Sequence, residues 1–186
     1  MLLVMAAVFF FRIDLRGREW IQQQRTTLTD AISRRVKPLG DGRYMLPPLA
    51  LVLCWGYLAH NSLLINMVWQ CFLSFALTGA IAQSCQFFIH RHRPNDSETP
   101  YQYDGPLFTS RNRSFPSGHA SVAFCLGTVL ASTFTQPVIV PIAIYTVATL
   151  TALSRLNDNM HWLSDVFTGT ALGILCALAS VQCTFV

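Results

Sequence analysis

Residues 114–165 have the sequence SFPSGHASVAFCLGTVLASTFTQPVIVPIAIYTVATLTALSRLNDNMHWLSD, in which an uncharged tract is followed by a polar segment. No Asp, Glu, Lys or Arg occurs from Ser114 to Ser154. A helix needs about 20 apolar residues to cross a bilayer, so this tract has the length of two membrane spans. Gln136 and Pro137 supply a turn between them. The pattern predicts a membrane hairpin that ends in the polar segment.

Two further tracts contain no charged residue, residues 44–90 and residues 166–186. The first has the length of two spans joined at residues 60–61, and the second has the length of one. Residues 1–11 add a shorter apolar run. We interpret this run as the end of a first span that begins upstream of it.

The paired spans place all 13 Lys and Arg and all 9 Asp and Glu on one side of the membrane. With 52% hydrophobic and 12% charged residues, we predict an all-α, multi-pass membrane helical bundle of about six transmembrane helices, forming one domain over residues 1–186. The net charge of +4 suits an anionic lipid surface, and nothing in the composition indicates nucleic-acid binding.

Residues 12–43 are polar, with apolar residues at nearly helical spacing and basic residues between them. We interpret them as an amphipathic helix in the plane of the lipid headgroups, with a solvated connector helix as the alternative. The cysteines lie in apolar tracts without a CxxC pair, so they are predicted to be small buried apolar side chains and not disulfide partners or metal ligands. They are Cys54, Cys71, Cys85, Cys125, Cys176 and Cys183.

The polar segment carries Arg155, His161 and Asp165 between two apolar tracts. Ionisable residues near hydrocarbon are costly and are functional candidates by default. His161 and Asp165 are four residues apart, so on a helix the carboxylate holds the proton-bearing nitrogen of the imidazole and leaves the other nitrogen free to attack. Arg155 has the planar five-donor cation that grips a phosphate. The alternative is that all three are interfacial anchors.

A second cluster, Ser117, Gly118 and His119, opens the next span. The Ser117 hydroxyl and the free amides of a helix start form an anion site, and Gly118 lets a ligand approach the backbone. His119 projects from the first turn and can serve as a proton donor. The alternative is a simple capping motif.

The basic cluster His90-Arg91-His92-Arg93-Pro94 ends the span before it. Arg93 precedes a proline, which fixes an extended backbone and aims the guanidinium inward. We interpret Arg91 as part of a basic collar at the membrane interface. All three clusters lie on the charged side of the predicted topology, so we expect them to meet at one membrane face.

These residues resemble the type 2 phosphatidic acid phosphatase (PAP2) superfamily, which shares its site with vanadium haloperoxidases. The family motifs are K-x6-R-P, P-S-G-H and S-R-x5-H-x3-D, and together they cover residues 86–165. The first motif matches only in Arg93 and Pro94, because Gln86 stands at the lysine position. The other two match with their spacing intact, at Pro116, Ser117, Gly118 and His119 and at Ser154, Arg155, His161 and Asp165.

The resemblance implies a membrane-embedded lipid phosphate phosphatase that uses no metal and no other cofactor. His161 would attack phosphorus and form a phosphohistidine, Asp165 would steady its ring, and His119 would protonate the leaving oxygen. The phosphate would be held by Arg93, Arg155, Ser117 and Gly118, with Gln86 at the lysine position. Substrates of this class include phosphatidic acid, phosphatidylglycerol phosphate, a polyprenyl pyrophosphate and a phosphorylated lipid A.

Gln86 leaves two alternatives open. A neutral amide donates hydrogen bonds but cannot neutralise a phosphate, and the loss of one transition-state donor costs about 10²- to 10³-fold in rate. We hypothesise that Arg91, Arg111 or Arg113 compensates; otherwise the protein is a catalytically weak lipid-phosphate binding protein. A different class of function is a metal site, which would be built from His90, His92, His119 and His161.

Two indications disagree about the side of the membrane on which the site lies. The resemblance implies an active site that faces away from the cytoplasm, whereas the excess of Lys and Arg on the same side predicts a cytoplasmic face. We follow the resemblance and expect a multi-pass protein of the cell or inner membrane with an extracytoplasmic site at the membrane-water interface.

Overall fold

The computed structural model describes residues 2–107 and 113–185, and over these ranges the protein is helical. The elements are α1 (Leu2–Gln23), α2 (Thr27–Val36), the 3₁₀ turn η1 (Lys37–Gly40), α3 (Gly42–Leu58), α4 (Ser62–Ile89), α5 (Gly118–Thr133), α6 (Ile139–Asn157) and α7 (Leu163–Ser180). β-Pairing within the described ranges is confined to one isolated bridge between Arg91 and Tyr103. The predicted all-α fold is confirmed.

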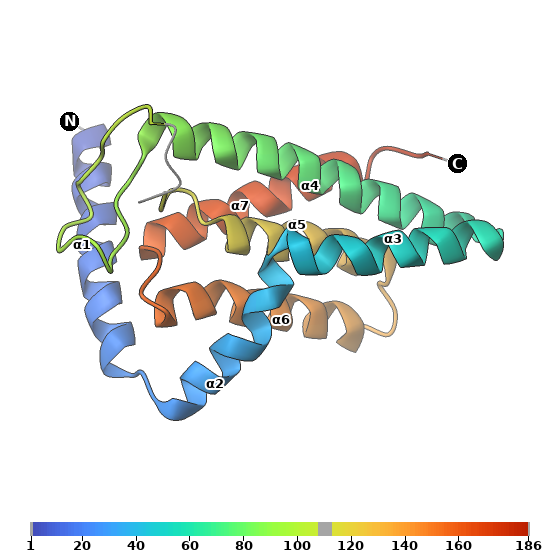
Figure 1. Cartoon of the computed structure of the whole chain (residues 1–186), viewed down its shortest axis with the longest axis horizontal. Helices are drawn as coiled ribbons and strands as arrows, with labels where there is room; N and C mark the ends of the chain where they lie inside the picture. The colour runs from blue at the N-terminus through green and yellow to red at the C-terminus, as the bar shows by residue number, and fades with distance from the viewer. Residues whose placement is uncertain (1, 108–112, 186) are drawn as a thin grey trace.

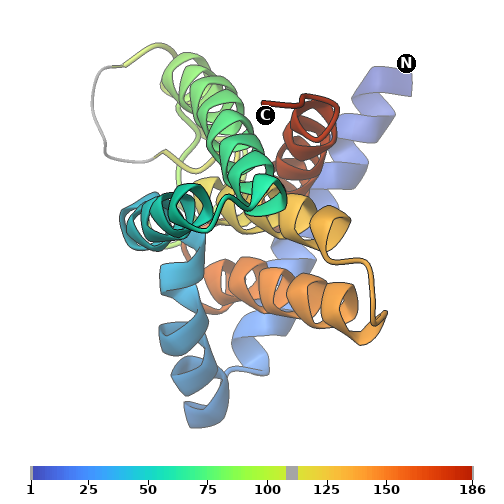
Figure 2. The same cartoon turned by 90° about the vertical axis from the view of Figure 1, so that its right-hand side faces the viewer.

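Helices α4 to α7 lie roughly along a common axis and form a bundle, with α3 folded back on α4 (Figures 1 and 2). The central helix α5 packs against α4, α6 and α7. Chain reversals at residues 59–61 and 134–138 separate the paired helices, as the sequence predicts. The last turns of α4 and α6 and the first turns of α5 and α7 therefore share one end of the bundle, which we call the charged end.

Helices α4, α6 and α7 are long and apolar enough to cross a membrane, and α5 is a shorter apolar helix. Helix α1 lies across the charged end of the bundle (Figures 1 and 2), where Arg18 donates to Asn159 at 3.2 Å. It continues unbroken from Leu2 to Gln23, and the prediction that residues 1–11 end a first span stays a prediction. The count of six spans is not confirmed.

The single amphipathic helix predicted over residues 12–43 is divided into several elements. Thr26 accepts a hydrogen bond from the Thr29 amide in a capping box and so starts α2 anew. Helix α2 packs along α6, and η1 packs against α5 and α6. Ser33 and Gly40 are buried, which shows that this segment packs against the bundle. The other side chains of α2 and η1 remain exposed or partly exposed, as predicted for a surface helix.

Close packing of α5 against α7 depends on two glycines. A Cβ atom on Gly169 would lie 2.5 Å from the Ser117 carbonyl oxygen, and one on Gly173 would lie 2.4 Å from that of Ser121. Real Cβ atoms do not approach so closely, so a larger residue would push the helices apart. The resulting proximity lets the Ser117 amide donate to the Asp165 carbonyl at 3.0 Å. Two of the three predicted clusters are joined in this way.

The apolar core lies between the helices of the bundle and contains Cys71, Cys125 and Cys176 as buried residues. Their burial confirms the prediction for these three. Cys54 is exposed, because it lies on an outward face of α3, and the prediction of burial is wrong there. All six cysteines lie in the described part of the chain and are free.

Candidate active site

The structure brings the three sequence clusters together at the charged end. Arg93 follows α4, His119 lies in the first turn of α5 and Arg155 lies in the last turn of α6. His161 lies in the connection from α6 to α7, and Asp165 is in the first turn of α7. The charges of Arg93 and Arg155 act on His161, and those of Arg155 and His161 act on His119. These four side chains therefore lie within electrostatic range of one another.

The imidazole of His161 is buried and held by the backbone. Its Nδ1 lies 2.8 Å from the carbonyl oxygen of Ser114. Because a carbonyl oxygen only accepts hydrogen bonds, Nδ1 carries the proton and Nε2 keeps its lone pair. Asp165 Oδ2 lies 3.8 Å from Nδ1, beyond hydrogen-bond distance. The predicted pairing with Asp165 is therefore a longer ion pair, the hydrogen bond is made to Ser114, and the predicted free nitrogen is retained.

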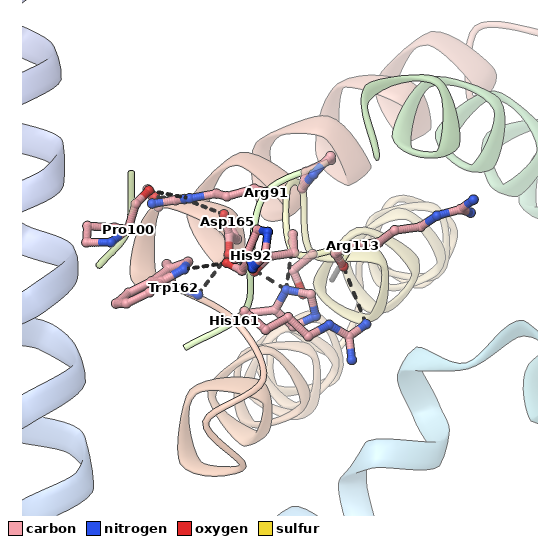
Figure 3. Close-up of polar contacts among 12 residues, drawn as sticks. Arg91, His92, Pro100, Arg113, His161, Trp162 and Asp165 are labelled. Carbon is pink, nitrogen blue, oxygen red and sulfur yellow. Dashed lines mark hydrogen bonds and ion pairs between the residues drawn. The ribbon is translucent and has the colours of Figure 1, made fainter. Parts of the chain in front are cut away.

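Asp165 stabilises the orientation of the His161 ring indirectly, through Ser114. Its Oδ2 accepts hydrogen bonds from the Ser114 hydroxyl and from the Trp162 amide, the latter at 2.8 Å. Its Oδ1 accepts from Arg91 Nη1 at 2.5 Å. Asp165 thereby fixes Ser114, whose carbonyl holds His161. Figure 3 shows Arg91, Trp162 and Asp165 close together beside His161.

Three donors of the site are buried without a partner. Within residues 2–107 and 113–185, the Nε of Arg93, the Oγ of Ser117 and the Nε of Arg155 have no hydrogen-bond partner. Buried polar atoms are normally paired, and an unpaired one costs about 1–3 kcal/mol. Each donor comes from a different sequence cluster, and two of them belong to cations. This arrangement suits an anion that has several oxygens, as a phosphate group has.

Gly118 and Gln86 border the space beside Ser117. A Cβ atom on Gly118 would meet only Gln86 Nε2, at 3.9 Å, so the space next to this backbone is open. Gln86 Nε2 donates to the Pro116 carbonyl at 3.0 Å, which ties α4 to the start of α5. Gln86 therefore lies at the site, and one of its two amide hydrogens is already used.

Arg91 lies in the interior and not at the surface. Its side chain is 3% exposed and donates to Asp14 Oδ2 at 2.7 Å and to Asp165 Oδ1 at 2.5 Å. Asp14 also accepts hydrogen bonds from the Ser164 amide and hydroxyl, each at 2.7 Å. The interpretation of Arg91 as an interfacial collar is wrong, because two buried carboxylates balance its charge. For the same reason Arg91 does not replace the charge that is missing at Gln86.

Asp14 and Ser114 are site residues that the sequence prediction missed. The available indication for Asp14 was a carboxylate at the edge of an apolar run. Its partner Arg91 is 77 positions away, and no local pattern joins them. Of the other candidates for compensation, Arg113 offers its carbonyl to Arg93 Nη2 at 3.4 Å, and Arg111 lies outside the described residues.

Two of the four histidines of the proposed metal site have separate partners. His92 Nε2 pairs with Asp104 at 2.8 Å, and His161 Nδ1 is held by Ser114. Among the residues that the structure describes, no three His, Cys, Asp or Glu side chains are placed to hold a metal ion. The geometry gives the metal-site alternative no support.

Over the described residues, the bundle of apolar helices, with two histidines and unpaired buried arginine donors at one end, has the features of a helical membrane protein. The sequence pattern of the PAP2 superfamily matches residues 67–186. The chain belongs to the PAP2 superfamily.

Named relatives agree with this family. The chain is 30% identical over 177 residues to a lipid A 1-phosphatase of Porphyromonas gingivalis. The match covers 93% of this chain and 35% of that protein, so the chain spans about a third of the length of this relative.

Two crystal structures share the fold. LpxE of Aquifex aeolicus superposes with a TM-score of 0.72 at 24% identity, over 91% of this chain and 95% of that one. The first transmembrane PAP2 type phosphatidylglycerolphosphate phosphatase from Bacillus subtilis superposes with a TM-score of 0.71 at 19% identity, over 97% and 90%.

Proposed function

We propose that the protein is a lipid phosphatase of the membrane interface that hydrolyses a phosphomonoester or pyrophosphate of a lipid. The observation that carries the proposal is the set of unpaired buried donors on Arg93, Ser117 and Arg155 near the fixed imidazole of His161. Enzymes of phosphoryl transfer work mainly by positioning and by stabilising charge on the phosphoryl oxygens. Membership of the PAP2 superfamily and the similarity to a lipid A 1-phosphatase support it.

The proposed reaction has two steps. The Nε2 lone pair of His161 attacks phosphorus, the bond from phosphorus to the leaving oxygen breaks, and His119 gives its proton to that oxygen. Water then attacks the phosphohistidine, His119 takes a proton from it, and the bond from nitrogen to phosphorus breaks to release phosphate. Arg93, Arg155 and the Ser117 hydroxyl stabilise the charge on the phosphoryl oxygens in both steps.

The proposal is tested by measuring phosphate release from a panel of lipid phosphates. Purified protein is expected to release phosphate from at least one of phosphatidic acid, phosphatidylglycerol phosphate, a polyprenyl pyrophosphate and a phosphorylated lipid A. Because no metal takes part in the proposed steps, release should persist in excess chelator. Absence of release from every member, with tight binding of one of them, would favour the binding-protein alternative.

A Gln86→Lys variant should gain little in kcat, by less than about tenfold. The Gln86 amide is engaged with the Pro116 carbonyl and borders Gly118, so it already supplies a donor at this position. The measurement is kcat for the best substrate of the panel, with Gln83→Lys on the exposed side of the same helix as the control. A gain of a hundredfold or more would mean that the natural chain is crippled at this position.

The acid limb of kcat/KM is expected below about pH 6.5, the ordinary pKa of histidine. Burial lowers the pKa of His161, and the neighbouring Asp165 offsets only part of this effect. The neutral, nucleophilic form therefore persists as the pH falls through 6.5, and protonation stops the reaction only at lower pH. A pH series of kcat/KM checks this, and an acid limb at or above pH 6.5 would contradict it.

We propose an extracytoplasmic site, following the family. Thr99 is exposed in the loop of the charged end, so a Thr99→Cys variant reports the side of the membrane. Labelling of intact cells by a membrane-impermeant thiol reagent is expected. Labelling only after the membrane is opened would place the site in the cytoplasm, as the positive-inside rule predicts.

A further inference from the structure

A cavity of about 220 Å³ lies beside His119, on the side of η1 and the first turn of α3. Most of its lining residues are basic or polar, in contrast to those of the apolar grooves elsewhere on the bundle. The lining residues are Arg34, Lys37, Pro38, Asp41, Arg43, Tyr44 and His119. Arg34, Lys37 and Arg43 belong to no PAP2 motif, so the basic side of the cavity adds to the phosphate donors described above, while His119 is shared with the site.

The walls of this cavity have an excess of positive charge. Arg43 and Asp41 neutralise each other, with Nη2 and Oδ2 2.6 Å apart. Lys37 Nζ lies 3.6 Å from Asp158 Oδ2, but that carboxylate is shared with Arg155 at 3.2 Å. Arg34 has no ion-pair partner within the described part of the chain, although its charge interacts with that of Asp30 over a longer distance. The cavity is therefore prepared for an anionic group.

The position of His119 tells which part of a substrate reaches the cavity. In an in-line transfer the leaving oxygen lies opposite the attacking nitrogen, and the proton donor lies beside the leaving oxygen. On the proposed function that donor is His119, which is also part of the cavity wall. The atoms attached to the leaving oxygen therefore extend into the basic cavity and not toward His161.

We infer that the preferred substrate has a leaving group that carries a second anionic group, a phosphate or phosphodiester, held in this cavity by Arg34 and Lys37. The inference rests on the proposed function and narrows its substrate class. A lipid pyrophosphate or a lipid with a second phosphate fits. Phosphatidic acid, whose leaving group is neutral diacylglycerol, fits less well.

An apolar groove next to the cavity supplies a place for the lipid chain. The groove has a volume of about 320 Å³ and lies between α5, α6 and η1, with Leu39 and Thr151 in its walls. Only the η1 turn separates it from the cavity. A Cβ atom on Gly40 would lie 2.8 Å from the His119 carbonyl oxygen and 2.9 Å from Thr151 Cγ2. The groove offers apolar walls for a lipid chain beside η1, which itself packs closely on His119 and Thr151.

The test compares two substrates with identical acyl chains, diacylglycerol pyrophosphate and phosphatidic acid, in micelles of an uncharged detergent. The leaving group of diacylglycerol pyrophosphate is an anion, and the leaving group of phosphatidic acid is a neutral lipid. In the Arg34→Gln variant, KM for the pyrophosphate is expected to rise by about tenfold, the usual value of one hydrogen bond to a charged group. KM for phosphatidic acid should change by less than about twofold. Lys37→Gln should act in the same direction.

Arg35→Gln is the matched control, because Arg35 is exposed on the same helix and does not line the cavity. Equal effects of Arg34→Gln on both substrates, or none on either, would overturn the inference and leave the proposed function standing. Inhibition by inorganic phosphate that vanishes in Arg34→Gln without substrate selectivity would assign the cavity to released phosphate, and so overturn it too. The proposed function fails only if no lipid phosphate of the panel is hydrolysed, and the inference then falls with it.

Discussion

The His161→Ala variant is expected to lose phosphate release by a factor of about 10⁴ or more in kcat. The only proposed route passes through the Nε2 atom of His161, which the Ser114 carbonyl keeps unprotonated. Binding of the lipid should change little, because the phosphate is held by Arg93, Arg155 and Ser117. The measurement is phosphate release from the best substrate, with lipid binding measured on the same preparation.

His60→Ala is a matched control for the loss of a histidine, since His60 is exposed in the turn at the opposite end of the bundle. A second readout tests the covalent step. Rapid acid-free quenching with a substrate labelled in its terminal phosphate should leave label on the natural protein in a linkage that is stable to base and labile to acid. Label that survives in His161→Ala, or substantial turnover by it, would reject His161 as the nucleophile.

The Arg91→Met variant is expected to lose about 3–5 kcal/mol of unfolding free energy. Arg91 lies between Asp14 and Asp165, both of which are fully buried. Its removal leaves two buried carboxylates without a cation, which costs far more than the pair itself contributes. Thermal unfolding in detergent, followed by tryptophan fluorescence, measures the change, because the Arg91 guanidinium lies 5.6 Å from the Trp162 ring.

A double-mutant cycle separates the orphaned charge from a simple loss of packing. Adding Asp14→Asn to Arg91→Met removes one of the two unpaired carboxylates, so the double variant should be more stable than Arg91→Met alone. Arg43→Met removes a surface ion pair, and its stability should match that of the natural chain. If Arg91→Met unfolds at the same temperature as the natural chain, the buried network does not stabilise the site.

The same network joins α1 to the nucleophile. Asp14 on α1 binds Arg91, Arg91 binds Asp165, and Asp165 fixes the Ser114 backbone that orients His161. Asp14 is a positioning residue in this scheme, because it touches no atom of the proposed substrate.

Much of the site was predictable because its motifs are local. His161 and Asp165 share a segment, Ser117, Gly118 and His119 share another, and the uncharged tracts require all segments to lie at one end. The Ser114 carbonyl was missed, because sequence spacing does not reveal that it comes closer to His161 Nδ1 than Asp165 does, whose Oδ2 lies 3.8 Å away.

The sequence by itself determined a helical membrane bundle, its charged end and the residues that gather there, because hydrocarbon thickness and helical spacing act on neighbouring residues. Only the tertiary structure decided that α1 crosses the charged end, that Arg91 is buried between Asp14 and Asp165, and that a basic cavity adjoins His119. The partner of a buried charge depends on which distant segments pack together, and this packing is set by the whole core.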